Sequence, residues 1–344
     1  MTKTLPIILS AGLLLTVLTS SSLNSAGRTS VPFPDSSMSE EDSTIAVIAW
    51  FNKRDTMTYW VNESSWEVNG KDTVKTASAA MKVMLTVTDS TSKGYKMEYR
   101  FLEFAADETI ESGMQKTVRD VVRKLQESTV GTTIRFQTDE LGQLTKYDNL
   151  NEVRRQAKSV LAEVISGIPY LDSLEAAGVN VDRLLKSIDT DALVDGYTEE
   201  IELMFQCHGG MFPAGEYSEH EDETDEQYAS DTYMYVAEDP DTYEYEIIMD
   251  INNYIPRDAV KAMLGDLVDV LLDDGAAKEA RENLDSEFDG QVTEDAVHNS
   301  YLFLKFFPDG WPEEIVSQEN TMIGDKGKLT QKYISWDYRS VGNF

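Results

Sequence analysis

Apolar and polar residues alternate in several stretches of the chain. Between Ala77 and Val87 the odd positions are all apolar, whereas the even positions include Ser, Lys and Thr. The same alternation runs from Tyr95 to Phe101 and from Tyr243 to Ile251. A period of two with one polar face is typical of a half-buried β-strand. These stretches therefore predict strands that turn one side toward a core.

Short turn sequences separate the predicted strands. Asn69-Gly70 lies between a strand near 56–68 and the strand that begins at Thr73. Asn-Gly favours a two-residue hairpin because both residues tolerate a positive φ. Further turn sequences lie at residues 92–94, 140–142, 239–241, 308–310 and 324–327. Consecutive hairpins predict an antiparallel meander, and we expect about eleven strands in it.

Apolar stripes with helical spacing mark the remaining ordered segments. They lie in residues 114–125, 153–168, 193–205 and 260–271. Each stripe needs an apolar surface to pack on, which the apolar side of the sheet provides. We therefore predict an α+β fold, with helices on the concave face of a large, curved, half-barrel-like antiparallel sheet. The repeated order of strands and helices suggests two related halves, 45–210 and 211–344.

The first residues have the composition of an export signal. Lys3 is followed by an apolar stretch from Leu5 to Leu18 and then by small polar residues. This order predicts a cleavable signal peptide over 1–26, with an uncleaved N-terminal anchor as the alternative. Residues 27–44 are rich in Gly, Ser, Pro and acidic residues, which predicts a disordered linker before an α+β body over 45–344.

The single cysteine, Cys207, bears on whether the protein is lipid-anchored and on its expected compartment. A lipid-anchored bacterial protein needs a cysteine at the signal cleavage site, and Cys207 lies far from it. An intramolecular disulfide is excluded, but a body of this size can bury enough apolar surface without one. We expect an extracytoplasmic protein, periplasmic or secreted, that is not lipid-anchored. No transmembrane segment is expected after the signal is removed.

The charge balance indicates which partners are compatible. The chain holds 62 acidic and 30 basic residues, for a net charge of −32. Such a charge repels nucleic acid and anionic lipid headgroups, and it favours solubility, cations and basic protein partners.

One window of the chain combines residues that bind metals. Cys207 and His208 precede an acidic stretch that contains His220, within residues 207–226. Thiolate, imidazole and carboxylate groups together are suitable ligands for zinc or a similar divalent ion. Cys207, His208 and His220 are therefore the candidate metal ligands. The alternative is a solvated acidic loop in which Cys207 packs at the end of a helix.

Aromatic and apolar residues on the predicted strands are candidates for lining a ligand cavity. The inward positions that we single out are Met97, Tyr99, Phe101, Tyr245 and Ile247. A gap between the sheet and its helices would give these residues an apolar cavity to line. The alternative is ordinary core packing, because aromatic residues favour strands.

Catalytic motifs do not emerge from the sequence. A hydrolase elbow of the form Gly-x-Ser-x-Gly is missing, and so is a Gly-rich phosphate loop. Cys207 and His208 are neighbours on a helix and would point about a hundred degrees apart, which disfavours a catalytic pair. An enzyme is therefore the third choice, behind two kinds of binding protein.

Two segments carry a resemblance to known exported proteins. The stretch 131–144, which leads into a helix, and the late turn Asp309-Gly310-Trp311-Pro312 resemble parts of the half-open barrel of Lol-type lipoprotein carriers. The chain also resembles uncharacterised exported proteins of Bacteroidetes that have such a half-barrel. This resemblance implies a binder of hydrophobic ligands or lipid tails. The alternative is a periplasmic or cell-surface protein-interaction module without a cavity.

Overall fold

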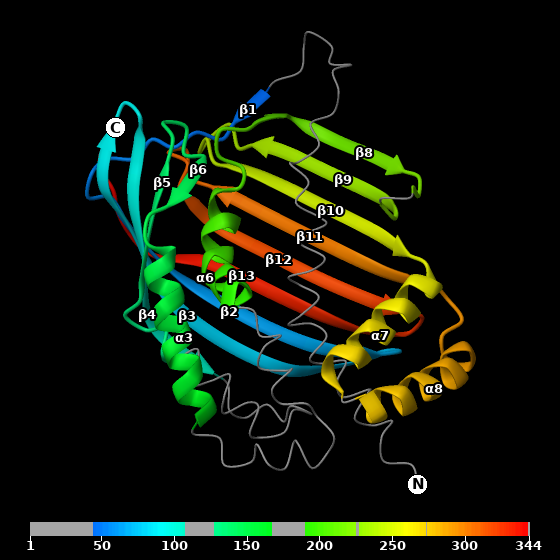
Figure 1. Cartoon of the computed structure of the whole chain (residues 1–344). Helices are drawn as coiled ribbons and strands as arrows, with labels where there is room; N and C mark the ends of the chain where they lie inside the picture. The colour runs from blue at the N-terminus through cyan, green and yellow to red at the C-terminus, as the bar shows by residue number, and fades with distance from the viewer. Residues whose placement is uncertain (1–43, 107–126, 167–189, 225–226, 273, 343–344) are drawn as a thin grey trace.

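The computed structural model describes residues 44–106, 127–166, 190–224, 227–272 and 274–342. The largest unit of the structure is one antiparallel sheet of eleven strands (Figure 1). Helices α3, α6 and α7 lie in front of this sheet in the view of Figure 1. The predicted α+β fold with a large, curved antiparallel sheet is therefore confirmed. The predicted export signal and linker, and the helix expected at 114–125, lie outside the described residues.

Two meanders build the sheet. The first comprises β2 (Thr56–Asn69), β3 (Asp72–Thr91), β4 (Gly94–Ala106), β5 (Thr133–Thr138) and β6 (Leu144–Tyr147). The second comprises β8 (Gly215–Glu221), β9 (Ala229–Glu238), β10 (Tyr245–Ile255), β11 (Ala296–Phe306), β12 (Pro312–Ile323) and β13 (Lys326–Ser340). The two meanders join in the middle of the sheet, where β13 pairs with β2, so that β6 and β8 form the outer edges.

The turns that were predicted from the sequence close these hairpins. Gly70 in the β2–β3 turn has a φ of 63°, the left-handed conformation that the Asn-Gly pair predicts. The strand expected at 243–251 begins two residues later, because Tyr243 has a φ of 60° and belongs to the preceding turn. A short separate pair is formed by β1 (Thr44–Ala46) and β7 (Met211–Pro213).

The helices pack in two pairs. The first pair is α3 (Leu150–Ser166) and α6 (Thr190–Phe205), and the second is α7 (Arg257–Leu271) and α8 (Asp274–Gln291). Helix α7 begins after Pro256, whose fixed φ suits the start of a helix. Among the described helices, none combines the length and apolar character that a membrane crossing requires.

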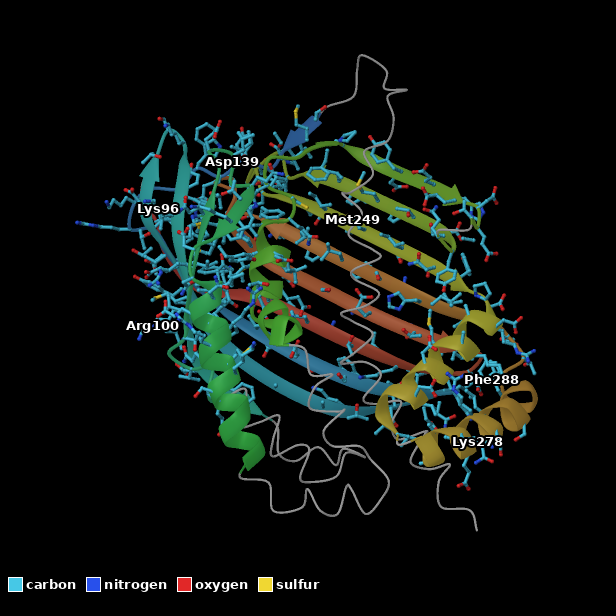
Figure 2. The ribbon with its side chains drawn as sticks, in the orientation of Figure 1. Lys96, Arg100, Asp139, Met249, Lys278 and Phe288 are labelled. Atoms are coloured by element: carbon cyan, nitrogen blue, oxygen red, sulfur yellow. The ribbon has the colours of Figure 1, made fainter. Side chains whose placement is uncertain are left out.

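The side of the sheet that carries the helices holds two separate apolar clusters. The larger contains Phe51, Phe205, Phe306 and Trp311 together with the inward residues of most strands. The smaller lies between the sheet and the α7–α8 pair and includes Phe288, which Figure 2 shows at that end of the molecule. Between the two clusters, this side of the sheet carries polar, half-buried residues such as Glu319 and Ser300. The apolar surface is therefore interrupted rather than continuous.

Candidate functional site

The three candidate metal ligands occupy different environments. Cys207 and His208 are buried, with 1% and 2% of their surface exposed, whereas the side chain of His220 is 58% exposed on strand β8. Within the described part of the chain, no group of three or more His, Cys, Asp or Glu residues is arranged to hold a metal ion. The structure thus does not bring Cys207, His208 and His220 together.

His208 has a packing role that explains its burial. Its ring lies 4.9 Å from the ring of Phe205 and 5.7 Å from that of Phe306, and its Nε2 lies 2.9 Å from the carbonyl oxygen of Gly310. Burial lowers the pKa of His208 to about 4, so the ring is neutral at pH 7. Burial likewise raises the pKa of Cys207 to about 12, which makes its thiol a poor nucleophile.

The five candidate cavity residues lie in the larger apolar cluster. Met97, Tyr99, Phe101, Tyr245 and Ile247 are each no more than 6% exposed. The rings of Tyr99 and Phe101 meet edge to face at 5.2 Å, and Tyr245 stacks on Phe306 at 5.2 Å. Aromatic contacts at these distances are those of a packed core. The structure therefore gives these residues packing contacts on the side where a cavity was predicted.

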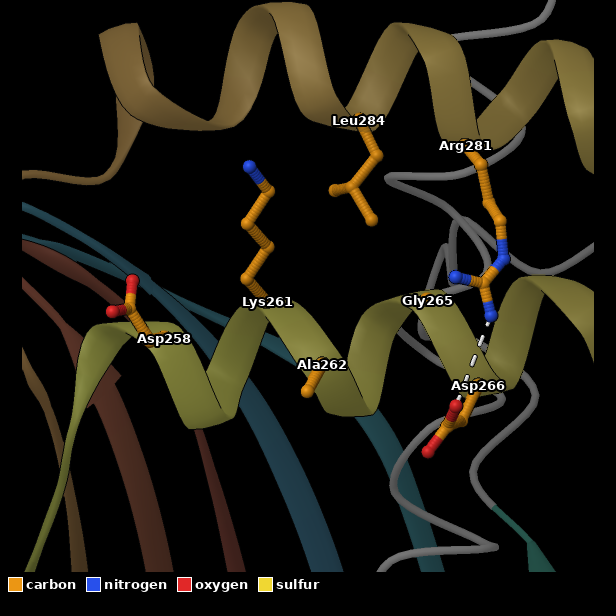
Figure 3. Close-up of a pocket in the computed structure, with 7 residues that line it drawn as sticks. All are labelled: Asp258, Lys261, Ala262, Gly265, Asp266, Arg281 and Leu284. Atoms are coloured by element: carbon orange, nitrogen blue, oxygen red, sulfur yellow. Dashed lines mark ion pairs between the residues drawn. The ribbon is translucent and has the colours of Figure 1, made fainter.

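A pocket of about 360 Å³ lies between α7 and α8 (Figure 3). It is lined by Asp258, Lys261, Ala262, Gly265, Asp266, Arg281 and Leu284. Two hydrogen bonds of 2.8 and 2.6 Å join Arg281 to Asp269, and Asp266 lies 3.8 Å from the same guanidinium. Most of the lining side chains are charged, so this pocket does not suit an acyl chain.

The opposite side of the sheet differs from the side that carries the helices. The described helices pack on one side only, and we call the other side, which no described helix covers, the uncovered face. On β9, Tyr233 and Tyr235 alternate with the buried residues Met234 and Val236 and so belong to the uncovered face. The same alternation places Tyr254 and Tyr301 there.

Register places carboxylates between these tyrosines. Asp250 is the cross-strand partner of both Tyr233 and Tyr301, and Glu216 is the partner of Tyr235. The hydroxyl of Tyr254 donates a 2.6 Å hydrogen bond to Asp231. We call this group the tyrosine patch and define it as Tyr233, Tyr235, Tyr254, Tyr301, Glu216, Asp231 and Asp250.

The tyrosine patch has a negative electrostatic character. Desolvation and then the charges of Asp250 and Glu246 raise the pKa of Tyr301, and desolvation and Glu216 raise that of Tyr233. The nearby Lys305 is neutralised by Glu313 at 2.7 Å and Glu244 at 2.9 Å. The patch therefore combines aromatic rings with carboxylates, and the nearby Lys305 is already paired with Glu244 and Glu313.

His220 lies at the outer end of the patch, next to Asp231. Its Nδ1 lies 2.7 Å from Asp231, the same carboxylate that accepts the Tyr254 hydrogen bond. The hydrogen bond that His220 makes to Asp231 raises the pKa of His220, and the hydrogen bonds that Asp231 accepts from Tyr254 and His220 lower the pKa of Asp231. His220 thus belongs to a hydrogen-bonded chain on the surface, at the edge of the sheet.

The sequence already contained a signal for this patch. Tyr233, Tyr235 and Tyr301 are among the strand aromatics, but composition alone does not say which side of the sheet they occupy. The alternation along β9 separates Tyr233 and Tyr235 from Met234 and Val236, and the pairing of Val236 with Ile247 then shows that the two tyrosines lie on the uncovered face.

Comparisons with known proteins give architectural similarity but no family. No family model and no curated protein matches the chain. A solved structure that describes lipid–protein interactions in lipovitellin is similar with a TM-score of 0.40 and 8% sequence identity. The similar region covers 86% of this chain but only 26% of that lipovitellin chain. No functional conclusion rests on this similarity, and the resemblance to Lol-type carriers stays a prediction.

Proposed function

We propose that this chain is an extracytoplasmic interaction module that binds a positively charged segment of a partner protein on the tyrosine patch. The observation that supports this proposal is the set of tyrosines and carboxylates that alternate on the uncovered face. Tyrosine offers a large and rigid contact surface with few rotatable bonds. Its ring also attracts Lys and Arg through cation–π interactions of about 0.5–1 kcal/mol at exposed sites.

Charge complementarity identifies the class of partner. The chain carries a net charge of −32, and the carboxylates Glu216 and Asp250 lie within the patch itself. Complementary charge speeds the encounter with a basic partner and disfavours acidic ones. An exposed tyrosine-rich surface is also the feature that distinguishes an interaction module from a carrier with an internal cavity.

The hydrophobic-ligand hypothesis is the second candidate and makes a different demand on the structure. It needs an apolar cavity, whereas Met97, Tyr99, Phe101, Tyr245 and Ile247 have packing contacts. A lipid site would therefore need to be built by other residues. Export of the chain and metal binding by it remain predictions from the sequence.

Titration with a defined cationic probe tests the proposal. A short peptide of alternating Lys and Thr is titrated into the protein by calorimetry at low salt, with a Ser-Thr peptide of equal length as the neutral control. The double variant Tyr233→Ser/Tyr235→Ser should bind the cationic peptide at least about tenfold more weakly, because aromatic anchors dominate such interfaces. Trp50→Ser is the matched control, since Trp50 is 58% exposed outside the patch.

Three results would count against the proposal. Equal binding of the neutral and cationic peptides would remove the role of charge. Equal binding by the patch variant and the wild type would place the site elsewhere. Saturable binding of a fluorescent fatty acid, displaced by lipid and unaffected by the patch variant, would favour the hydrophobic-ligand hypothesis instead.

A further inference from the structure

The two edges of the sheet differ in how well they are protected. The edge strand β6 has four residues, and its pairing with β5 shifts register between Gln137 and Thr138. The hydroxyl of Tyr147 on β6 also donates a 3.4 Å hydrogen bond to Glu202 of α6. Short length, irregular pairing and a neighbouring helix are the usual means of blocking further strand pairing. One edge of the sheet is therefore closed.

The other edge lacks these features. Strand β8 has seven residues and pairs with β9 in continuous register from Gly215 to Glu221. It contains no proline, and no described strand or helix lies beyond it in the sheet. An edge of this kind presents a row of N–H and C=O groups that can pair with a further strand.

Carboxylates on both sides of β8 determine which charge an added strand should carry. Glu216 lies on the uncovered face, and Glu219 and Glu221 lie on the opposite side, all of them exposed. A second copy of this edge would place carboxylate against carboxylate, which is unfavourable for neighbouring strands. An added strand with basic residues would place their side chains next to these carboxylates on both sides of the sheet, which is favourable.

We propose that β8 accepts an extended basic segment of a partner protein as an additional strand of the sheet. This inference rests on the proposed function and specifies how the partner is held, since β8 carries Glu216 of the tyrosine patch and pairs with β9 at Glu216–Tyr235 and His220–Asp231. Backbone hydrogen bonds provide affinity, and the carboxylates of β8 select basic side chains. The tyrosines of β9 lie one strand further in, within reach of long Lys and Arg side chains.

The test uses two peptides with identical charges. One is the alternating Lys-Thr peptide, and the other carries N-methyl groups on every second backbone nitrogen along one edge. Strand addition requires those N–H groups, whereas attraction between charges does not. The methylated peptide should therefore bind at least about tenfold more weakly. Hydrogen exchange should show that the unmethylated peptide protects amides in residues 215–221.

The outcomes separate this inference from the proposed function. Equal affinity of the two peptides, with loss of binding in Tyr233→Ser/Tyr235→Ser, would overturn strand addition and leave the proposed function in place. Absence of binding by both peptides would overturn both. Protection of residues 144–147 at the opposite edge, in place of 215–221, would also contradict the inference.

A variant of the edge provides a second test. Glu216→Gln/Glu219→Gln should weaken binding of the unmethylated peptide by about tenfold, because two of the selecting charges are removed. The matched control is Glu98→Gln/Glu152→Gln, which removes two charges from β4 and α3. Equal weakening in both variants would indicate general charge attraction and contradict selection by β8.

Discussion

The two sides of strands β9 and β10 differ in how much of their apolar and aromatic residues is exposed to solvent. On the side that carries the helices, Val236 and Ile247 are at most 1% exposed. On the other side of the same strands, Tyr233 and Tyr254 are 36% and 38% exposed. Sequence alternation produces both sides, and core forms on the side where residues of β1, β7 and α6, such as Ile45, Phe212 and Phe205, join the same apolar cluster. The difference indicates that the apolar side supplies stability and the tyrosine side is available for binding.

Charged residues repeat this contrast. On the covered side, Lys332 is 6% exposed and lies 3.2 Å from Glu200, 3.0 Å from Glu199 and 3.4 Å from Glu63. On the uncovered face, Glu216 is exposed to solvent. Burial makes a charge costly unless it is paired, whereas an exposed carboxylate keeps its hydration. Glutamate residues are therefore structural on the covered side and available to a partner on the uncovered face.

The largest expected effect comes from creating a cavity on the covered side. Phe306→Ala removes a fully buried ring that stacks on Tyr245 and contacts His208. The free energy of unfolding should fall by about 4 kcal/mol, as measured by chemical denaturation. Phe303→Ala is the matched control, because Phe303 lies on the same strand but is half-buried on the uncovered face. A control variant that lost as much stability would show that the uncovered face is packed as tightly as the core.

Removal of the buried ammonium group of Lys332 should lower the free energy of unfolding slightly less than Phe306→Ala does. Lys332→Met leaves the 3%-exposed Glu200 without its cation and should lower the free energy of unfolding by about 3 kcal/mol at pH 7. Burial already raises the pKa of Glu200 in the folded protein above its ordinary value of 4.5. Protonation therefore favours the fold, so the loss should be small below pH 4.5 and should grow as the pH rises. A loss that is independent of pH would contradict this assignment.

Lowering the pH should reduce the stability of the protein through protonation of His208 on the covered side. The pKa of His208 is about 4 in the folded protein and 6.5 ordinarily. A lowered histidine pKa means that stability is complete above pH 6.5 and is lost as the pH falls toward 4. The difference between the two pKa values corresponds to roughly 3 kcal/mol at most. Comparison of wild type with His208→Gln across this range should show a smaller loss in the variant, and equal losses would assign the effect to other groups.

The smallest effect on stability is expected on the uncovered face. Glu216→Gln should change the free energy of unfolding by no more than about 0.5 kcal/mol, because Glu216 is an exposed residue on the edge strand. The same change should slow the association of the cationic peptide and reduce its dependence on salt. Stopped-flow measurements at two salt concentrations check this, and an unchanged association rate would exclude Glu216 from the encounter.

Local sequence patterns predicted much of the fold. The alternation in 77–87 and the Asn69-Gly70 turn correctly identified β3 and its hairpin. Helix α8 was not predicted, because its stripe of Ala277, Ala280 and Leu284 is narrow within a highly charged segment. The pairing of β2 with β13 was also not predicted, since it joins distant parts of the chain and no local signal specifies it.

The candidate site was harder to predict, for a physical reason. Alternation places Tyr233 on the opposite side of β9 from Met234, but only the pairing of Met234 with Met249 relates it to Tyr245 on β10, and only the fold shows which side the helices cover. Cys207 and His208 were considered as ligands because of their types, whereas their burial depends on contacts with Phe205 and Phe306 that only the fold creates. Long-range packing therefore decided the role of each candidate.

The most direct test of the account compares tyrosine rings on the two sides of the sheet. NMR spectra of protein with isotope-labelled tyrosine rings are recorded during titration with the Lys-Thr peptide. Signals of Tyr233, Tyr235, Tyr254 and Tyr301 should shift with a common affinity, while those of the buried Tyr59, Tyr99 and Tyr245 should stay in place. Shifts confined to the buried tyrosines, or the absence of any saturable shift, would contradict the claim that this protein binds its partner on the uncovered face.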